Sequence, residues 1–294
     1  MNLDSSKSRD WFWQRVIEDK LISIPSGDRW VTERINYQTL VNKLSNISKS
    51  HVNFRTVEML SIDSYERLPS YLRALDCGII RLGAYKNTTE FILCKPTKGA
   101  RYLYLFNEQL FSTSAGMEVS IDDSGYGIIT RLLQRIDRLD ERLALSVFPY
   151  IFPLGDIFNI TVHKVLSLSY KRNHTFKFII ENGFEPVEFI NGQIEVDQML
   201  LLISKEGQYK IVVLEGKFGS NKKSIAKHKI LYSTMVAKMI FPEADEIIPA
   251  YLYIADMEGN VSFDFCTFKM DYRDGMPVLT SITTNGVYYI KISR

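Results

Sequence analysis

Cysteine and histidine are scarce in this 294-residue chain, which has three cysteines and four histidines. The cysteines, at positions 77, 94 and 266, are odd in number and scattered, which argues for a reducing compartment and against a disulfide framework. The histidines lie far apart, and no Cys/His group has the spacing of zinc ligands. We therefore expect neither a disulfide-stabilised secreted domain nor a zinc protein.

Long apolar runs and targeting segments are also lacking. No run approaches the ~20 apolar residues of a membrane-spanning helix. The first residues, MNLDSSKSRDWFW, lack the continuous apolar stretch of a signal peptide. Gly125 and Gly127 are not followed by the Lys and Ser or Thr of a phosphate loop, so no nucleotide cofactor is expected. These absences predict a cytoplasmic protein with no membrane partner.

The composition is that of an ordinary globular protein, with 46% hydrophobic and 24% charged residues. Residues 1–115 are predicted to form an α+β domain, with helical segments within 10–75 followed by strand-like runs at 78–85, 89–96 and 101–108. Helices followed by a β-hairpin resemble a winged-helix, DNA-reading module. A plain α+β domain or a dimerisation element is the alternative. In a DNA-reading domain, the residues expected to contact phosphates or base edges are Arg67, Arg73, Arg81, Lys86 and Lys98.

The rest of the chain divides into a connection and a second domain. Residues 116–149 are predicted to be a polar linker followed by a long periodic helix over 126–148. Residues 150–294 are predicted to hold a helical lead-in over 156–182, a strand over 185–197, an apolar hairpin, a helix and further strands. The expected class is α+β, with a central mixed sheet flanked by helices.

The hairpin is the most informative feature. Two apolar strands, DQMLLLIS and YKIVVLE, are joined by the polar turn KEGQ. If Ser204 pairs with Tyr209, Asp197 lies opposite Gly216, and opposed residues are ~5 Å apart. Glu215 and Lys217 are two residues apart and share one face of their strand. Two carboxylates and an ammonium group are thus expected to converge at the end of an apolar sheet.

Such a group can hold a hard divalent cation, which selects carboxylate and carbonyl oxygens. A metal ion beside a phosphate stabilises developing charge and makes water a better nucleophile. The lysine can hold that water or neutralise the phosphate. The sequence therefore predicts a magnesium-dependent hydrolytic site.

This constellation resembles the active site of the PD-(D/E)xK nuclease superfamily, which includes most type II restriction endonucleases. The resemblance implies a restriction-endonuclease-like core, whose order of helix, three strands, helix and strand matches residues 150–294. It implies that Asp197, Glu215 and the Gly216 carbonyl bind Mg²⁺, that Mn²⁺ can substitute, and that Lys217 orients the water. Because Val196 replaces the usual proline and Glu195 shares the face of Asp197, Glu195 is an alternative first carboxylate.

A basic segment follows the hairpin, with five lysines and no acid between residues 217 and 229. A helix is predicted over 224–240 with Ser224 as its N-cap. Lysines oppose the dipole of a helix start, whereas a helix N-terminus flanked by lysines suits phosphate. The predicted DNA contacts are Lys222, Lys223, Lys227 and Lys229. In the family, the helix after the Glu-x-Lys strand often turns a polar residue to the site, a place that Lys227, Lys229 or Tyr232 could take.

These patterns together predict a Mg²⁺-dependent endonuclease of double-stranded DNA, of the type II restriction kind. Cutting both strands of a palindrome calls for two sites related by a twofold axis, so a homodimer is expected. A DNA repair or junction-resolving nuclease is the alternative within the same class. A non-catalytic DNA-binding or assembly protein, whose hairpin is only structural, is the alternative from another class.

Overall fold

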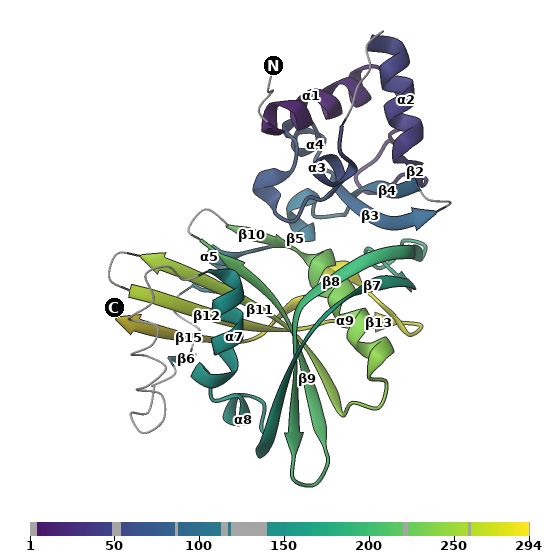
Figure 1. Cartoon of the computed structure of the whole chain (residues 1–294). Helices are drawn as coiled ribbons and strands as arrows, with labels where there is room; N and C mark the ends of the chain where they lie inside the picture. The colour runs from purple at the N-terminus through teal and green to yellow at the C-terminus, as the bar shows by residue number, and fades with distance from the viewer. Residues whose placement is uncertain are drawn as a thin grey trace.

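The chain is an α+β protein built on one large mixed sheet flanked by helices (Figure 1). The computed structural model describes residues 5–48, 54–85, 88–112, 117–118, 140–219, 223–257 and 260–293. In this part of the chain no helix is long and apolar enough to cross a membrane.

The helices differ in length, and the longer ones are α1, α2, α7 and α9. In chain order the helices are α1 (Ser5–Glu18), α2 (Tyr37–Ser48), α3 (Thr56–Leu60), α4 (Ser70–Ala74), α5 (Asn107–Leu110), α7 (Glu141–Ile151), α8 (Leu154–Ile157) and α9 (Lys227–Ile240). Short 3₁₀ turns span Tyr65–Arg67, Ala100–Leu103 and Leu279–Ser281.

The strands of the large sheet run in the order β1-β4-β3-β8-β9-β11-β12-β15-β6, with β2 beside β4 and β7 beside β8. Their bounds are β1 (Trp30–Val31), β2 (Ile35–Asn36), β3 (Gly78–Tyr85), β4 (Thr88–Lys95), β6 (Met117–Glu118), β7 (Val162–Phe178), β8 (Val187–Ser204), β9 (Tyr209–Phe218), β11 (Glu246–Met257), β12 (Asn260–Lys269) and β15 (Thr283–Ser293). Two small sheets pair β5 (Tyr104–Phe106) with β10 (Ser224–Ala226), and β13 (Tyr272–Arg273) with β14 (Met276–Pro277).

The centre of the sheet is buried on both faces. Along β8 and β9 successive apolar side chains point to opposite faces, as the two-residue period of a strand requires. One set packs into the core that contains α9: Met199, Leu201, Ile211 and Val213. The other set packs into the core that contains α7: Leu200, Leu202, Val212 and Leu214. Because β9 and β11 are parallel, the chain between them crosses over one face through α9.

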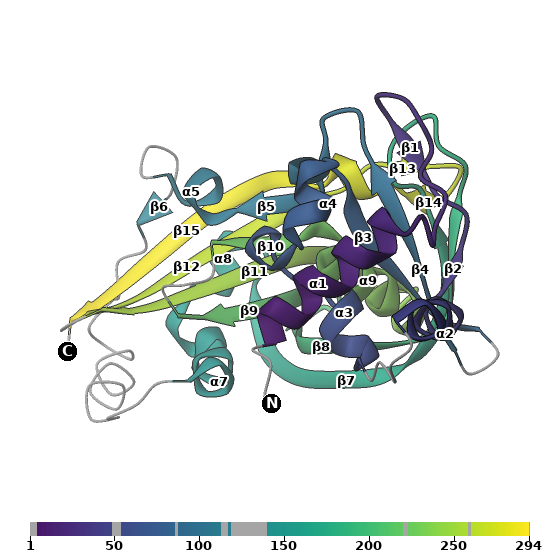
Figure 2. The same ribbon diagram turned by 90° about the horizontal axis from the view of Figure 1, so that it is seen from above.

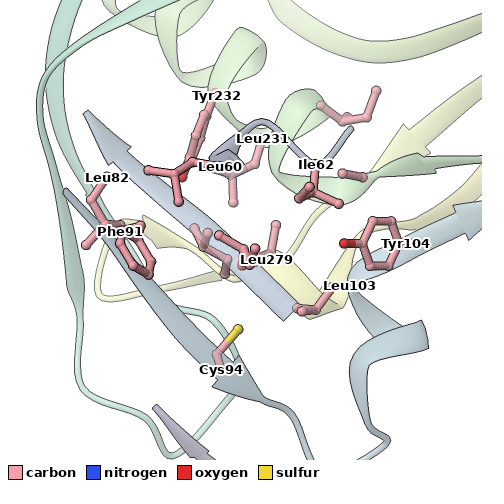
Figure 3. Packing of buried hydrophobic residues seen from close by; sticks show 14 of the residues in the cluster. Leu60, Ile62, Leu82, Phe91, Cys94, Leu103, Tyr104, Leu231, Tyr232 and Leu279 are labelled. Atoms are coloured by element: carbon pink, nitrogen blue, oxygen red, sulfur yellow. The ribbon is translucent and has the colours of Figure 1, made fainter. Parts of the chain in front are cut away.

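The N-terminal strands join this sheet where β3 pairs with β8, at Gly83 and Ile190. Gly83 has φ +87°, and a Cβ there would lie 2.2 Å from the Ile190 carbonyl oxygen, so only glycine fits. Figures 1 and 2 show α1, α3 and α4 gathered over β3 and β4. These helices share an apolar core with α9, and Figure 3 shows Leu60 and Leu231 among the residues of this core.

Two predicted strands are present as expected, and one predicted helix is wrong. The runs 78–85 and 89–96 form the β3–β4 hairpin. The helical lead-in over 156–182 is instead the short helix α8 followed by the 17-residue strand β7. β7 pairs with β8 along most of its length, and its β-branched and aromatic residues suit that pairing. β8 is continuous, so the predicted strand 185–197 and the first hairpin strand are one element.

The predicted helix over 224–240 begins three residues late, at Lys227. Residues 224–226 form β10, which pairs with β5, so the predicted N-cap role of Ser224 is wrong. Its hydroxyl donates to Glu66 Oε2 and accepts from the Tyr65 N–H. Of the predicted helix over 126–148, only the end lies within the described residues, as the first part of α7.

Candidate active site

The site lies where β8 and β9 part. Their ladder runs from the pair Ile203–Tyr209 to the pair Gln198–Leu214 and ends there. Beyond it, β9 continues beside β11, while the earlier part of β8 stays beside β7 and reaches β3 (Figure 1). Asp197 and Glu215 are the first residues past the last pair, so both stand at the fork between the strands.

The register of the hairpin differs from the predicted one by one residue. Ser204 N–H donates to the Gln208 carbonyl at 2.9 Å, which leaves a three-residue loop ending at Gly207 with φ +84°. Such loops commonly carry glycine at this position. Ile203 rather than Ser204 therefore pairs with Tyr209. The predicted opposition of Asp197 and Gly216 is wrong, and continuing the observed register places Asp197 opposite Glu215.

The two-residue alternation of β8 is interrupted at Asp197. The pairing of β8 with β7 shifts between the pairs Leu168–Met199 and Tyr170–Val196, so β8 has one extra residue there. Asp197 lines a cleft at the start of α7, and its Oδ2 lies 3.9 Å from Lys217 Nζ. The three side chains that were predicted to converge therefore do meet.

The Lys217 ammonium group is surrounded by the three predicted metal ligands. Its Nζ donates to Glu215 Oε1 at 2.9 Å and to the Gly216 carbonyl at 2.6 Å. It lies 3.9 Å from Asp197 Oδ2, which in turn accepts the Gly216 N–H at 3.0 Å. Two carboxylates and a backbone carbonyl thus converge on one cation.

Burial and charge set the protonation of this cluster. Glu215 is 2% exposed and Lys217 is 8% exposed. Burial, reinforced by the charge of Glu215, raises the pKa of Asp197 to about 6. Burial alone would raise the pKa of Glu215, but Lys229 and Lys217 together outweigh it and lower that pKa. Burial likewise disfavours the Lys217 ammonium, yet Glu215 and Asp197 raise its pKa above the ordinary value.

The first turn of α9 supplies a second cation. Lys229 Nζ donates to Glu215 Oε1 at 3.2 Å, and the pKa of Lys229 is raised, chiefly by Glu215. The other two candidates for the polar residue from this helix are engaged elsewhere. Tyr232 Oη donates to the Arg81 carbonyl, and Lys227 Nζ donates to the Thr280 carbonyl. Of the three, the structure brings only Lys229 into the site.

The donor set fits a hard divalent cation. Glu215 Oε2 is buried without a hydrogen-bond partner among the described residues, and an unsatisfied buried carboxylate oxygen is costly. Mg²⁺ takes such oxygens and usually keeps several waters. The described residues contain no group of three or more His, Cys, Asp or Glu side chains that could hold a metal. A cation held here would therefore have two carboxylates and the Gly216 carbonyl as its protein ligands.

Glu195, the alternative first carboxylate, is placed apart from this cluster. Its side chain is 64% exposed, and Oε2 accepts from Lys171 Nζ at 2.8 Å on the outer edge strand β7. Asp197, by contrast, is 21% exposed and contacts the Gly216 N–H. Asp197, and not Glu195, is therefore the carboxylate that lies beside Glu215 and Lys217.

The four predicted DNA-contacting lysines have different surroundings. Lys222 lies outside the described residues, and Lys223 is exposed. Lys229 is engaged by Glu215. Lys227 is 4% exposed, and its Nζ lies 4.4 Å from the centre of the Tyr102 ring as well as on the Thr280 carbonyl. A phosphate cannot reach this buried ammonium, so we leave Lys227 out of the proposed DNA contacts.

Replacing Lys227 with methionine is expected to raise stability at neutral pH. Burial, with a smaller effect of Lys98, lowers the pKa of Lys227 to about 8. Between pH 8 and about 10.5 the unfolded chain holds a proton that the folded chain has lost, so wild-type stability rises with pH there. The shift is worth at most ~3 kcal/mol, and loss of the Thr280 hydrogen bond offsets ~1 kcal/mol. We expect a net gain of ~1–2 kcal/mol below pH 8 that disappears toward pH 10.5.

The measurement is urea unfolding of both proteins across pH 6–10.5. A variant that is less stable than wild type at pH 7 would contradict the expectation. Affinity for DNA should be the same in both proteins.

Two clefts flank the fork, and Glu195 lines both of them. One, of about 750 Å³, lies between the start of α7 and strands β7 and β8, and Asp197 lines it. The other, of about 660 Å³, lies between the N-terminal helices and the pair β8 and α9, and is lined by Arg81 and Lys229. Arg73 is exposed on α4 and lines neither cleft.

The second cleft is also lined by Arg9, Asp63 and Arg67. Of these, only Arg67 was predicted to contact DNA, and no sequence motif connects any of the three to the site. These residues lie more than 100 positions before the hairpin, and no local pattern ties them to it. Only the packing of α1 and α3 beside α9 brings them there.

Comparison with known proteins gives no match, whether to a protein-family model, to a curated protein or to a solved structure.

Proposed function

We propose that this protein is a Mg²⁺-dependent endonuclease that hydrolyses phosphodiester bonds of double-stranded DNA. The observation that carries the proposal is the convergence of Asp197, Glu215 and the Gly216 carbonyl on the Lys217 ammonium at the fork of two strands. The unpartnered Glu215 Oε2 supports a cation at the same place.

Each residue has a distinct part in this proposal. Asp197, Glu215 and the Gly216 carbonyl would hold the ion, which supplies charge stabilisation at the phosphate and a more reactive water. Lys217 would position the attacking water and offset the charge of the phosphate. Lys229 keeps Glu215 ionised at neutral pH, since it helps to lower that pKa, and it fixes the carboxylate by a hydrogen bond.

The order of elements around the site supports a restriction-endonuclease-like core. α7, β7, β8, β9, α9 and β11 occur in the order helix, three strands, helix and strand, with the short helix α8 inserted after α7 and β10 inserted before α9. We therefore favour a type II restriction enzyme, whose two cuts in a palindrome would be made by a homodimer. Exposed Lys223 is retained as a phosphate contact.

Cleavage of plasmid and phage DNA, with Mg²⁺ and with EDTA, tests this function. Discrete fragments would support a sequence-specific restriction enzyme. Nicking at random positions would favour a repair or junction-resolving nuclease. Intact DNA under all conditions would favour a non-catalytic DNA-binding or assembly protein.

The choice of metal ion is expected to follow the oxygen ligands. Mg²⁺ should support cleavage and Mn²⁺ should substitute, whereas Ca²⁺, which is larger and prefers more ligands, should support DNA binding without efficient cleavage. The measurement is the cleavage rate with each ion after removal of residual metal. Cleavage that continues undiminished in excess EDTA would exclude the proposed site chemistry.

A further inference from the structure

The 660 Å³ cleft beside the site is formed by parts of the chain that are distant in sequence. Its walls come from α1, the segment from Glu58 to Arg67, β3, β8 and the first turns of α9. The cleft reaches the fork through Lys229, which lines it and also donates to Glu215. A substrate strand that leaves the fork on this side therefore enters the cleft.

Arg81, on β3, brings an uncompensated positive charge to this cleft. Its Nε is buried without a hydrogen-bond partner, and no carboxylate pairs with its guanidinium among the described residues. The backbone at this residue is held, because the Arg81 carbonyl accepts from Tyr232 Oη at 2.8 Å. A partly buried cation without a partner is costly, so an external anion would be bound favourably.

The acids that line the cleft do not neutralise Arg81, because each is close to another cation. Asp63 accepts from Arg67 at 3.0 Å, and Glu195 accepts from Lys171 at 2.8 Å. Glu58 lies 4.0 Å from Arg55. The cleft therefore keeps an excess of positive charge.

Two further arginines, Arg9 and Arg67, line the same cleft. Arg9 donates to the carbonyls of Glu58 and Arg67, so its charge is not neutralised by those bonds. The Arg67 side chain is 56% exposed, and its Nη1 donates to Asp63 Oδ1 at 3.0 Å. Guanidinium groups present a planar set of donors that matches phosphate oxygens.

We infer that this cleft is a second phosphate subsite, in which Arg81, assisted by Arg67, binds a phosphodiester of the substrate strand next to the one that is cut. The inference rests on the proposed function and adds to it a determinant of substrate binding. It places the N-terminal helices in contact with the strand beside the site.

The test compares Arg81→Gln and Arg67→Gln with Arg273→Gln, which alters an exposed arginine that lines neither cleft. Affinity for a fluorescent DNA duplex is measured with Ca²⁺ at several salt concentrations. Arg81→Gln should bind about tenfold more weakly, as expected for loss of a charge-assisted hydrogen bond. Its plot of log affinity against log salt should be flatter by ~0.9, the value for one phosphate contact. Arg273→Gln should match wild type in both.

A structural role of Arg81 is separated by kinetics and by a conservative variant. Loss of a phosphate contact should raise KM more than it lowers kcat. Arg81→Lys should keep the wild-type salt slope because it keeps the charge. If Arg81→Gln does not fold, the exposed Arg67→Gln carries the test, with a smaller loss of affinity in the same direction.

The outcomes separate failure of this inference from failure of the proposed function. If wild type cleaves DNA and both cleft variants match Arg273→Gln in affinity and slope, the subsite is refuted and the nuclease stands. If wild type neither binds nor cleaves DNA, both are refuted. If inorganic phosphate binds in an Arg81-dependent way while DNA does not, the cleft serves a small phosphate ligand, and a strand-binding subsite is refuted.

Discussion

Replacing Glu215 with glutamine is expected to reduce the rate of DNA cleavage by at least about 10³-fold while DNA binding persists. The carboxylate would be a ligand of the catalytic ion, whose charge stabilisation is worth several kcal/mol in the transition state. Glutamine keeps an acceptor for Lys217 and Lys229 but removes the negative charge between them. The measurement is single-turnover cleavage with Mg²⁺, beside DNA binding in Ca²⁺. Full activity in this variant would end the assignment of the site.

Glu215→Gln also carries a risk for the fold, because breaking a buried ion pair costs ~3–5 kcal/mol.

Asp197→Asn provides a second test of the site, with less risk to the fold. The pKa of Asp197 is raised to about 6, so its charge is unfavourable in the folded protein and asparagine should not destabilise it. Cleavage should be lost all the same. Glu195→Gln is the matched control on the same strand and should stay active. If instead Glu195→Gln loses cleavage and Asp197→Asn keeps it, Glu195 is the first metal ligand.

Replacing Lys217 with methionine is expected to have two opposite effects, loss of cleavage and tighter binding of the metal ion. The ammonium contacts the Glu215 carboxylate and the Gly216 carbonyl, which are two of the groups that would bind the cation. At an effective dielectric constant of about 20, two unit charges ~4 Å apart interact by ~4 kcal/mol. Removing the competing charge should therefore raise the affinity for Mn²⁺ at least about tenfold.

Titration of the DNA-free protein with Mn²⁺, followed by electron paramagnetic resonance or calorimetry, measures this affinity. Lys210→Met is the matched control, because Lys210 lies on the same strand but pairs with Glu246 at the other end. An affinity in Lys217→Met equal to that of the control would mean that Lys217 does not compete for the ligands. A variant with tighter metal binding but normal cleavage would remove Lys217 from the chemistry.

The order of elements near the site was largely predictable from local pattern. The apolar runs of the β8–β9 hairpin, the β3–β4 hairpin and most of α9 follow from periodicity and from turn residues. β7 was not predictable in this way. Most of its residues are exposed, so it lacks the alternation of buried and exposed positions that marks a half-buried strand, and its pairing with β8 makes it a strand.

The amino-acid sequence by itself determined which groups are available for chemistry, namely Asp197, Glu215 and Lys217 within one apolar hairpin. The tertiary structure decided whether they meet. A three-residue loop shifts the register of the hairpin by one position, and an extra residue in β8 between Val196 and Met199 breaks the two-residue alternation at Asp197. Likewise, no local pattern could reveal that Arg81 stands beside the site. Its position depends on β3 packing against β8 and α9, a contact between residues more than 100 positions apart.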